Sequence, residues 1–183
     1  MTTDAIVRWI LEHFEGDAYT DDPLDSGGAT RWGITLRTWQ YFVTHVRGEP
    51  RTVTKGEMKR LALEDAVQCI LAMHVGEGRL DRIPDWRLQF VVIDWAIHSW
   101  YVAPLKALQS SIAGLVVDGA LGSKTAAALA GEDPMRLTTA IVGLRIGWLD
   151  GLIRRRPKDE RFRKGWMRRV GEGARFVSLP AAD

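Results

Sequence analysis

The chain of 183 residues contains one cysteine, no long uninterrupted apolar run and no basic leader segment. Cys69 cannot form an internal disulfide, and its apolar neighbours predict a packed, unreactive thiol. The most apolar stretch, residues 88–105, is interrupted by Asp94 and His98, so it predicts a buried helix and no membrane span. The first residues, Met-Thr-Thr-Asp-Ala, lack the pattern of a signal peptide, and we therefore expect synthesis in the cytoplasm.

The composition is that of an ordinary globular protein, with 46% hydrophobic and 26% charged residues. The formal net charge is only +2, but it is unevenly spread. The segment Arg154–Arg175 holds ten lysines and arginines against three acids, which makes it +7 and the remainder of the chain −5. A basic end of this kind favours an anionic polymer such as cell wall or nucleic acid; the alternative is a solvated helix face.

Helical periodicity and helix-end signals predict a mainly α protein. Two short strand-like pieces, residues 18–20 and 29–34, predict one small β-hairpin near the N-terminus. We expect a single compact unit with two lobes, residues 1–85 and residues 86–183. The expected helices cover residues 3–14, 35–46, 54–73, 85–100, 104–112, 123–130, 134–155 and 159–170.

Residues 17–34 lack a helical period, and the stretch 14–35 that contains them carries a concentration of polar groups. Glu15 ends the first expected helix, and Gly16 follows it as a natural C-terminal cap. Loops rich in carboxylates and glycines carry function more often than they fill cores, so we interpret this stretch as the candidate active site. Its further polar and turn residues are Asp21, Asp22-Pro23, Asp25, Gly27-Gly28 and Thr30.

Two carboxylates that face each other across a cleft are the usual equipment for cleaving a glycosidic bond. Glu15 closes an apolar helix, so partial desolvation is expected to favour its protonated form and the role of general acid. Asp25, in a solvated turn, would stay ionised, and the Thr30 hydroxyl would orient a water molecule. The alternatives are a calcium site or a merely solvated loop, but the acids lack the spacing of a calcium-binding loop, and we expect no metal.

A specific pattern runs through residues 15–35. Its elements are Glu15-Gly16, Tyr19, Asp22-Pro23, Asp25, Gly27-Gly28, Thr30 and Gly33-Ile34-Thr35. In this pattern the chain resembles the N-acetylmuramidases of glycoside hydrolase family 108, which include phage lysozymes and the so-called secretion-activator proteins. Later stretches are also similar to the family, namely Asp94–Ser99, Leu105–Gln109, and the run Val117-Asp118-Gly119 with Gly122 and Thr125, which is like the pattern of its peptidoglycan-binding region.

The resemblance implies a lysozyme-like helical fold with a small β-hairpin. It also implies hydrolysis of the glycan bond between N-acetylmuramic acid and N-acetylglucosamine, with Glu15 as general acid and without a cofactor. The partner would be the glycan strands of peptidoglycan. Asp25 and Thr30 follow Glu15 at spacings close to the Glu, Asp, Thr arrangement of tailed-phage lysozymes, which favours a catalytic assignment for both.

Aromatic side chains supply candidates for stacking on sugar rings. Tyr19 and Trp32 in the polar stretch, together with Trp95 or Trp100, are predicted to contact substrate in this way. From the resemblance, the substrate-binding set also includes Asp94 and His98, although a histidine on an apolar helix is typical of a core. The chain departs from the family in two respects: Gly-Asp-Ala precedes Tyr19 where Gly-Gly is usual, and His98 and Trp100 replace Asn and Gly.

Other functions remain open from the sequence. One is a peptidoglycan-binding or secretion-accessory protein whose active site is impaired by the Asp17-Ala18 insertion; another is a lytic transglycosylase. Nucleic-acid binding is not expected, because few aromatic residues are interleaved with the basic ones. Without a signal peptide, a muramidase would reach the periplasm or cell wall through a holin, an export system or lysis, as a phage or prophage endolysin or as a secretion-linked enzyme.

Overall fold

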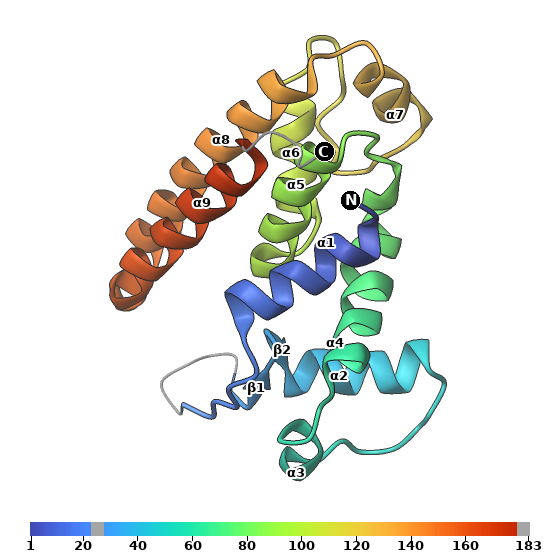
Figure 1. Cartoon of the computed structure of the whole chain (residues 1–183), viewed down its shortest axis with the longest axis vertical. Helices are drawn as coiled ribbons and strands as arrows, with labels where there is room; N and C mark the ends of the chain where they lie inside the picture. Colours follow the sequence, from blue (N-terminus) through green and yellow to red (C-terminus); the bar gives the residue numbers. More distant parts are fainter. Residues whose placement is uncertain (23–27, 179–183) are drawn as a thin grey trace. The chain divides into compact units, whose positions relative to one another are not determined.

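The computed structural model describes residues 1–22 and 28–178 of the protein. They belong to two compact units, Met1–Glu77 and Gly78–Asp183. Within the described ranges the structure is predominantly helical, and its only sheet is a two-stranded antiparallel hairpin near the N-terminus (Figure 1). The prediction of a mainly α fold with one small hairpin is confirmed. Asp25, the predicted second carboxylate, lies outside the described residues.

The first unit begins with one continuous helical rod. Helix α1 (Thr3–Ile10) passes directly into the π-helical turn η1 (Leu11–Glu15), so the rod ends at Glu15, as predicted. Gly16 then turns the chain with a φ of 68°, a positive value that glycine adopts without strain. The rod packs on α4 (Leu63–Ile70), and its buried stripe consists of Ile6, Val7, Ile10 and Leu11.

The hairpin has two residues of strand on each side of a two-residue turn. Strand β1 (Thr30–Arg31) pairs with β2 (Ile34–Thr35), with Thr30 opposite Thr35. The turn residues Trp32 and Gly33 have φ values of 52° and 69°, and positive φ at both positions is typical of the type I′ turn of tight hairpins. Residues 18–20 were predicted to form the first strand, but they contribute only an isolated bridge from Thr20 to Thr30. The two predicted pieces therefore do pair, but at one position only, and the second strand of the hairpin is Ile34–Thr35 across the tight turn.

Further helical segments complete the first unit. Helix α2 (Leu36–Tyr41) continues into η2 (Phe42–Val46) from the N-cap Thr35, which confirms the helix predicted for residues 35–46. The helix predicted for residues 54–73 is wrong in its first part, because it breaks after one turn. Backbone carbonyls in the break accept hydrogen bonds from the side chains of Arg31 and Trp32 instead of from a next helical turn. The observed segments are α3 (Lys55–Met58), α4 and η3 (Leu71–Gly76).

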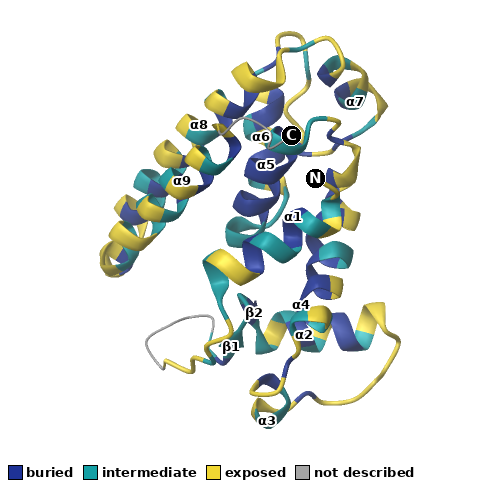
Figure 2. Ribbon diagram, in the orientation of Figure 1, coloured by how far each residue is buried: buried dark blue, intermediate teal, exposed yellow. Residues whose placement is uncertain are grey.

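The second unit is built around one buried helix. Helix α5 (Trp86–Ser99) begins at the N-cap Asp85, whose carboxylate accepts hydrogen bonds from the backbone N–H groups of Arg87 and Leu88 at 2.9 and 3.1 Å. Residues 88–96 are all buried, so this helix is enclosed on every side, as predicted (Figure 2). It packs against α6 (Val102–Ser110), α8 (Pro134–Arg155) and α9 (Arg163–Ser178).

The other helix ends of the second unit mostly follow local sequence signals. Helix α8 covers the predicted residues 134–155, with Asp133 as N-cap and Pro134 in the first turn. Helices α6 and α7 (Ser123–Leu129) begin and end close to their predicted bounds. The helix predicted for residues 159–170 is wrong in its bounds, because the 3-10 segment η5 (Pro157–Phe162) comes first and α9 runs on to Ser178. A short 3-10 turn, η4 (Leu80–Arg82), precedes α5.

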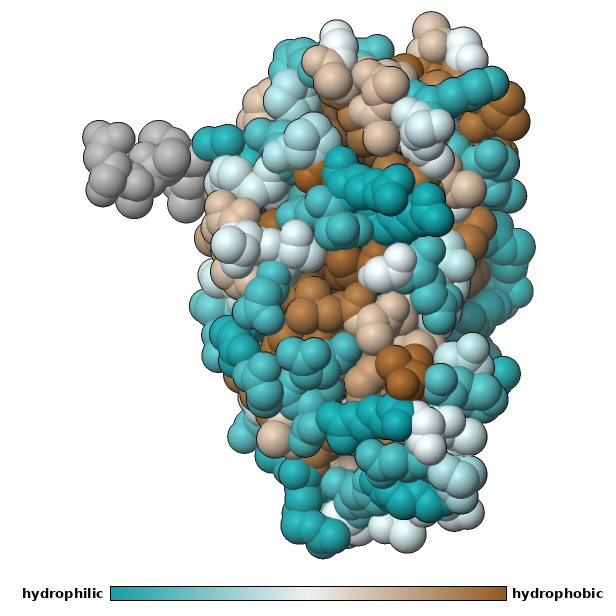
Figure 3. Space-filling view, turned by 90° about the vertical axis from the view of Figure 1, so that its right-hand side faces the viewer, coloured by the Kyte–Doolittle hydropathy of each residue, from teal (hydrophilic) through white to brown (hydrophobic). Residues whose placement is uncertain are grey.

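None of the helices in residues 1–22 and 28–178 combines the length and the apolar character that crossing a membrane requires. On the face drawn in Figure 3, hydrophilic residues interrupt the apolar ones. Cys69 is fully buried, and this burial raises the pKa of its thiol to about 12, which confirms the predicted packed and unreactive cysteine.

Candidate active site

The candidate site is organised around the end of the first helical rod. Glu15 is half-buried there, and the hairpin turn packs directly against its side chain. A Cβ atom at Gly33 would lie 2.6 Å from the carboxyl carbon of Glu15 and 2.8 Å from its Oε2, which is closer than side chains tolerate. Glycine at position 33 therefore serves both the positive φ of the turn and the close approach of the turn to the Glu15 carboxyl.

Two side chains of the hairpin tie it to the segment that follows α3. The indole N–H of Trp32 donates to the backbone carbonyl of Leu61 at 3.1 Å. The guanidinium of Arg31 donates to the carbonyl of Lys59, and its Nε is buried without a hydrogen-bond partner among the described residues. These two bonds hold the turn, and with it Gly33, in place against Glu15.

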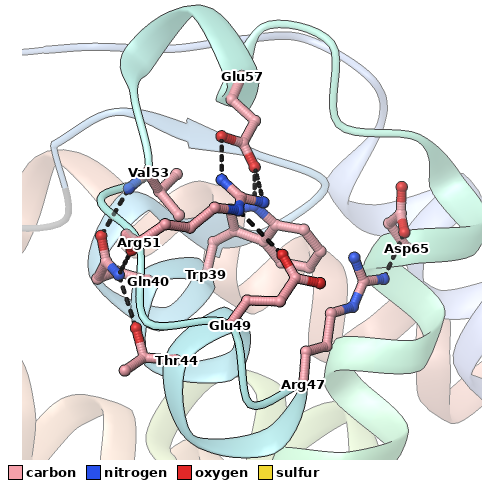
Figure 4. A network of polar contacts seen from close by, with 9 residues as sticks. All are labelled: Trp39, Gln40, Thr44, Arg47, Glu49, Arg51, Val53, Glu57 and Asp65. Carbon is pink, nitrogen blue, oxygen red and sulfur yellow. Dashed lines mark hydrogen bonds and ion pairs between the residues drawn. The ribbon is translucent and has the colours of Figure 1, made fainter.

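A network of polar contacts joins α2 to α3 and to the loop between them (Figure 4). This network, here called the clasp, is made by Trp39, Gln40, Arg51, Val53 and Glu57. The guanidinium of Arg51 donates to both carboxylate oxygens of Glu57 at 2.8 Å, and the indole N–H of Trp39 donates to the same carboxylate at 3.3 Å. Gln40 donates to the Arg51 carbonyl and accepts from the Val53 N–H, both at 2.7 Å. The hydrogen bond from Arg51 lowers the pKa of Glu57. The clasp thus supports α3 and, through it, the carbonyls that anchor the hairpin.

The flanks of the polar stretch are fixed by a second set of contacts. The Thr30 hydroxyl donates to the Gly28 carbonyl at 2.9 Å, and the Tyr19 hydroxyl donates to Asp21 at 3.3 Å. The Lys55 ammonium donates to the same Asp21 carboxylate at 2.8 Å and lowers its pKa. The structure therefore places Tyr19, Thr30 and Trp32 in the unit that contains Glu15, on the segments that flank the undescribed residues 23–27.

The arrangement places one carboxyl and two aromatic side chains in the same unit. A half-buried carboxyl can hold and release a proton, and the aromatic rings of Tyr19 and Trp32 are half-buried rather than enclosed. Arg31 was not singled out by the sequence, and neither were the carbonyls of Lys59 and Leu61. Nothing in the sequence marks a backbone carbonyl as an anchor, because every residue has one.

The remaining predicted contact residues lie in the second unit, on α5 and at its end. Asp94 is the most constrained of them, because its side chain is only 2% exposed and is enclosed by two arginines. Arg145 from α8 donates to one carboxylate oxygen, and Arg169 from α9 donates to the other at 2.7 Å. Burial alone would raise the pKa of Asp94, but the two guanidinium groups more than offset it and lower the pKa. This placement favours a role in joining three helices over the predicted contact with substrate.

His98 lies one turn further along α5, among aromatic side chains. Its ring makes an edge contact with Trp148 at 5.8 Å between centroids and a tilted contact with Trp166 at 4.9 Å. Burial, together with the positive charges of Arg145 and Arg169, lowers the pKa of His98 to about 3, against the opposing effect of Asp94. At neutral pH the imidazole is therefore uncharged, with one nitrogen that can donate a hydrogen bond and one that can accept.

The low pKa of His98 predicts a loss of stability in acid. The unfolded chain takes up a proton near pH 6.5, whereas the folded protein does not do so until about pH 3, so stability falls as the pH drops through that window. Between pH 6.5 and pH 5 the expected loss from this group is about 1.6 kcal/mol. Urea unfolding of the wild type and of His98→Gln at both pH values measures it. Equal losses in the two proteins would contradict the assignment.

Trp95 and Trp100 are placed very differently. Trp95 is 2% exposed, and its indole N–H is buried without a hydrogen-bond partner among the described residues, which favours packing over the predicted sugar stacking. Trp100 is half-buried and ends α5 with φ 71° and ψ 159°, a backbone region that is nearly exclusive to glycine. Its N–H donates to the Ala96 carbonyl at 2.7 Å, so the helix end is well formed despite the strain.

Comparing two substitutions at Trp100 isolates this strain. Trp100→Ala and Trp100→Gly both remove the indole, but only glycine adopts the observed backbone angles freely. We expect the glycine variant to be more stable than the alanine variant by about 1–3 kcal/mol. Chemical denaturation of both proteins gives the difference. If alanine proves as stable as glycine, the strain is absent.

The Asp-Gly motif after α6 forms a turn organised by a single buried side chain. The Gln109 amide donates to Asp118 at 2.7 Å and to the Ala120 carbonyl at 3.0 Å, and it accepts from the Gly119 N–H at 2.7 Å. Gly119 has φ 80°, and a Cβ there would lie 2.9 Å from Val102. Asp118 and Gly119 of the motif therefore have a structural role, because they fix the shape of this turn.

Both halves of the chain match families of known proteins. Residues 7–99 match the family described as glycosyl hydrolase 108, and residues 103–171 match one described as a predicted peptidoglycan domain. Among solved structures, the chain is similar to SagA of Brucella abortus, with 30% sequence identity and a TM-score of 0.78, over 99% of this chain and 98% of that one. No curated protein matches the chain. In the part of the chain that the structure describes, no cluster of three or more His, Cys, Asp or Glu side chains is placed to hold a metal ion.

Proposed function

The chain belongs to the glycosyl hydrolase 108 family, and from this premise we propose that it is an N-acetylmuramidase that hydrolyses the glycan strands of peptidoglycan. The bond cleaved joins N-acetylmuramic acid to N-acetylglucosamine. The proposal is carried by the position of Glu15, a half-buried carboxyl at the end of a rigid helix, against which a glycine turn is packed. A proton donor must be held in this way to meet the bridging oxygen in a fixed orientation.

In the proposed reaction the Glu15 carboxyl gives its proton to the bridging oxygen as the bond to the anomeric carbon breaks. A water molecule supplies the hydroxyl group to that carbon, and its proton passes to a carboxylate, for which Asp25 is the candidate. Thr30 would help to orient the water. Tyr19 and Trp32 would offer their aromatic faces to the sugar rings on either side of the bond.

A second function is favoured by a specific observation. Residues 103–171 match a predicted peptidoglycan domain, and the insertion Asp17-Ala18 stands next to Glu15. A protein that binds peptidoglycan without cleaving it would show the same match. A lytic transglycosylase is the third candidate, because it would need the acid Glu15 without a second carboxylate.

Product analysis on purified peptidoglycan separates the three functions. The full chain is incubated with sacculi, new reducing ends are measured, and the released muropeptides are identified by mass spectrometry. Hydrolysis is expected to release fragments that end in reducing N-acetylmuramic acid. Fragments that end in the anhydro sugar would assign a transglycosylase. Protein that pellets with sacculi and releases no fragment would assign a binding protein and overturn the proposal.

A further inference from the structure

A strongly basic segment of the chain lies where α8 turns into α9. Residues 154–164, here called the basic tip, hold seven lysines and arginines against two acids, a formal net charge of +5. The tip consists of the end of α8, the segment η5 and the start of α9, and η5 packs on these two helices. Figure 1 shows this turn at the end of the α8–α9 pair that is distant from α6.

Part of the charge in the basic tip is neutralised within the structure. Arg156 pairs with the buried Asp159 at 2.8 Å, and Arg163 pairs with Glu160 at 2.7 Å and also with Asp150. These pairs fix the shape of the turn. Of the other five cations, Arg161 lies over an aromatic ring. The remaining four are exposed and have no ion pair among the described residues, namely Arg154, Arg155, Lys158 and Lys164.

Two aromatic side chains belong to the same part of the chain as these four cations, Phe162 inside the basic tip and Trp166 two residues after it. Phe162 and Trp166 are half-buried and stacked, with 5.7 Å between their ring centroids, and the Arg161 guanidinium lies 4.5 Å from the centre of the Phe162 ring. Rings that are partly exposed next to arginines and lysines are typical of surfaces that meet the headgroup layer of a membrane. There the ring enters the layer and the cation pairs with phosphate.

We propose that the basic tip docks the protein onto a membrane surface rich in anionic phospholipid headgroups. The tip is the end of a helical pair, so its cations project from a turn and can meet a planar array of phosphates together. A duplex nucleic acid is the competing partner for such charge, but it is usually met by a stripe of cations along a helix or in a groove. Clusters of four to eight cations are enough to hold a segment at an anionic lipid surface.

The strength of this docking should depend on charge and salt. Each cation near an anionic surface contributes roughly a fivefold gain in binding, so removal of the four free cations is expected to weaken binding by roughly 600-fold. Raising the ionic strength to about 0.5 M should release the wild type, because the charges are exposed and are screened over a few ångströms.

The test is co-sedimentation of the full chain with vesicles of phosphatidylglycerol and phosphatidylethanolamine, beside vesicles of phosphatidylcholine alone. The test variant is R154Q/R155Q/K158Q/K164Q. Its control makes the same change of net charge at exposed cations elsewhere, as R37Q/R60Q/R82Q/K124Q. We expect the wild type and the control to bind only the anionic vesicles at low salt, and the test variant to lose this binding. Urea unfolding confirms that both variants are folded.

Several outcomes would overturn the proposal. No binding of the wild type to anionic vesicles, or equal losses in the two variants, would remove the tip as a lipid-docking surface. Tighter binding to a DNA duplex than to vesicles would assign the charge to nucleic acid. Loss of pelleting with lipid-free sacculi in the test variant alone would assign it to the cell-wall polymer. Release of reducing ends from sacculi is measured separately, so failure of the muramidase proposal stays distinguishable from failure of this one.

Discussion

Replacing Glu15 by glutamine is expected to abolish the release of reducing ends from peptidoglycan, with a loss of at least a hundredfold in rate. Positioned general acids contribute about 10²–10⁴-fold, and the glutamine amide has no proton of suitable acidity to give. The side chain keeps its length, so its contact with the turn at Gly33 should persist and the fold should be retained. The measurement is the initial rate of solubilisation of sacculi, with reducing ends as the chemical readout.

The chain offers a matched control on the same rod. Glu12 is exposed and lies less than one helical turn before Glu15, so Glu12→Gln makes the same chemical change away from the hairpin. We expect this variant to retain the rate of the wild type. Thermal unfolding should be unchanged in both. If Glu15→Gln solubilises sacculi at the same rate as Glu12→Gln, Glu15 is not the general acid.

Replacing Asp94 by asparagine is expected to cost about 3–5 kcal/mol of unfolding free energy, because it leaves two guanidinium groups without their counter-charge. Arg145 is 4% exposed and Arg169 is 16% exposed, so water cannot fully take the place of the carboxylate. A domain is stable by roughly 5–15 kcal/mol in total, so the variant loses a large fraction of its stability. Urea unfolding at pH 7 measures the difference.

The comparison for this variant is Asp150→Asn, which breaks the exposed pair with Arg163. Those side chains are 37% and 39% exposed, and such pairs are worth about 0–1 kcal/mol. The lowered pKa of Asp94 adds a signature in pH: its stabilisation is present above about pH 4 and is lost as the pH falls further. Asp94→Asn should lack that acid limb. A cost as small as that of Asp150→Asn would show that the three helices do not depend on the buried pair.

The sequence alone indicates the role of Glu15, but it does not indicate the role of Asp94. Glu15 stands at a helix end that periodicity and Gly16 predict, inside a motif of contiguous residues, so the sequence alone nominates it. Asp94 also lies in a stretch that resembles the family, but its partners come from 51 and 75 residues further along the chain. Nothing in the local pattern shows that these arginines converge on it, and a role at the substrate was therefore the natural expectation.

The break after α3 likewise could not be predicted from local sequence signals. Residues 54–73 have good capping and apolar periodicity, yet the chain stops being helical after Met58. The carbonyls of Lys59 and Leu61 are taken by Arg31 and Trp32, which lie 28 and 29 residues earlier. Long-range hydrogen bonds of this kind override propensity, because propensities differ by less than about 1 kcal/mol per residue.

By itself the sequence determined the mainly helical class, most helix ends, the unreactive cysteine and the motif around Glu15. These follow from interactions over a few residues, such as caps, turns and apolar periodicity, which each stretch carries in itself. Only the tertiary structure decided that Gly33 packs on the Glu15 carboxyl, that Asp94 joins three helices, and that four cations of the basic tip are left without acids. Those outcomes depend on which distant side chains meet, and packing of the whole unit settles that.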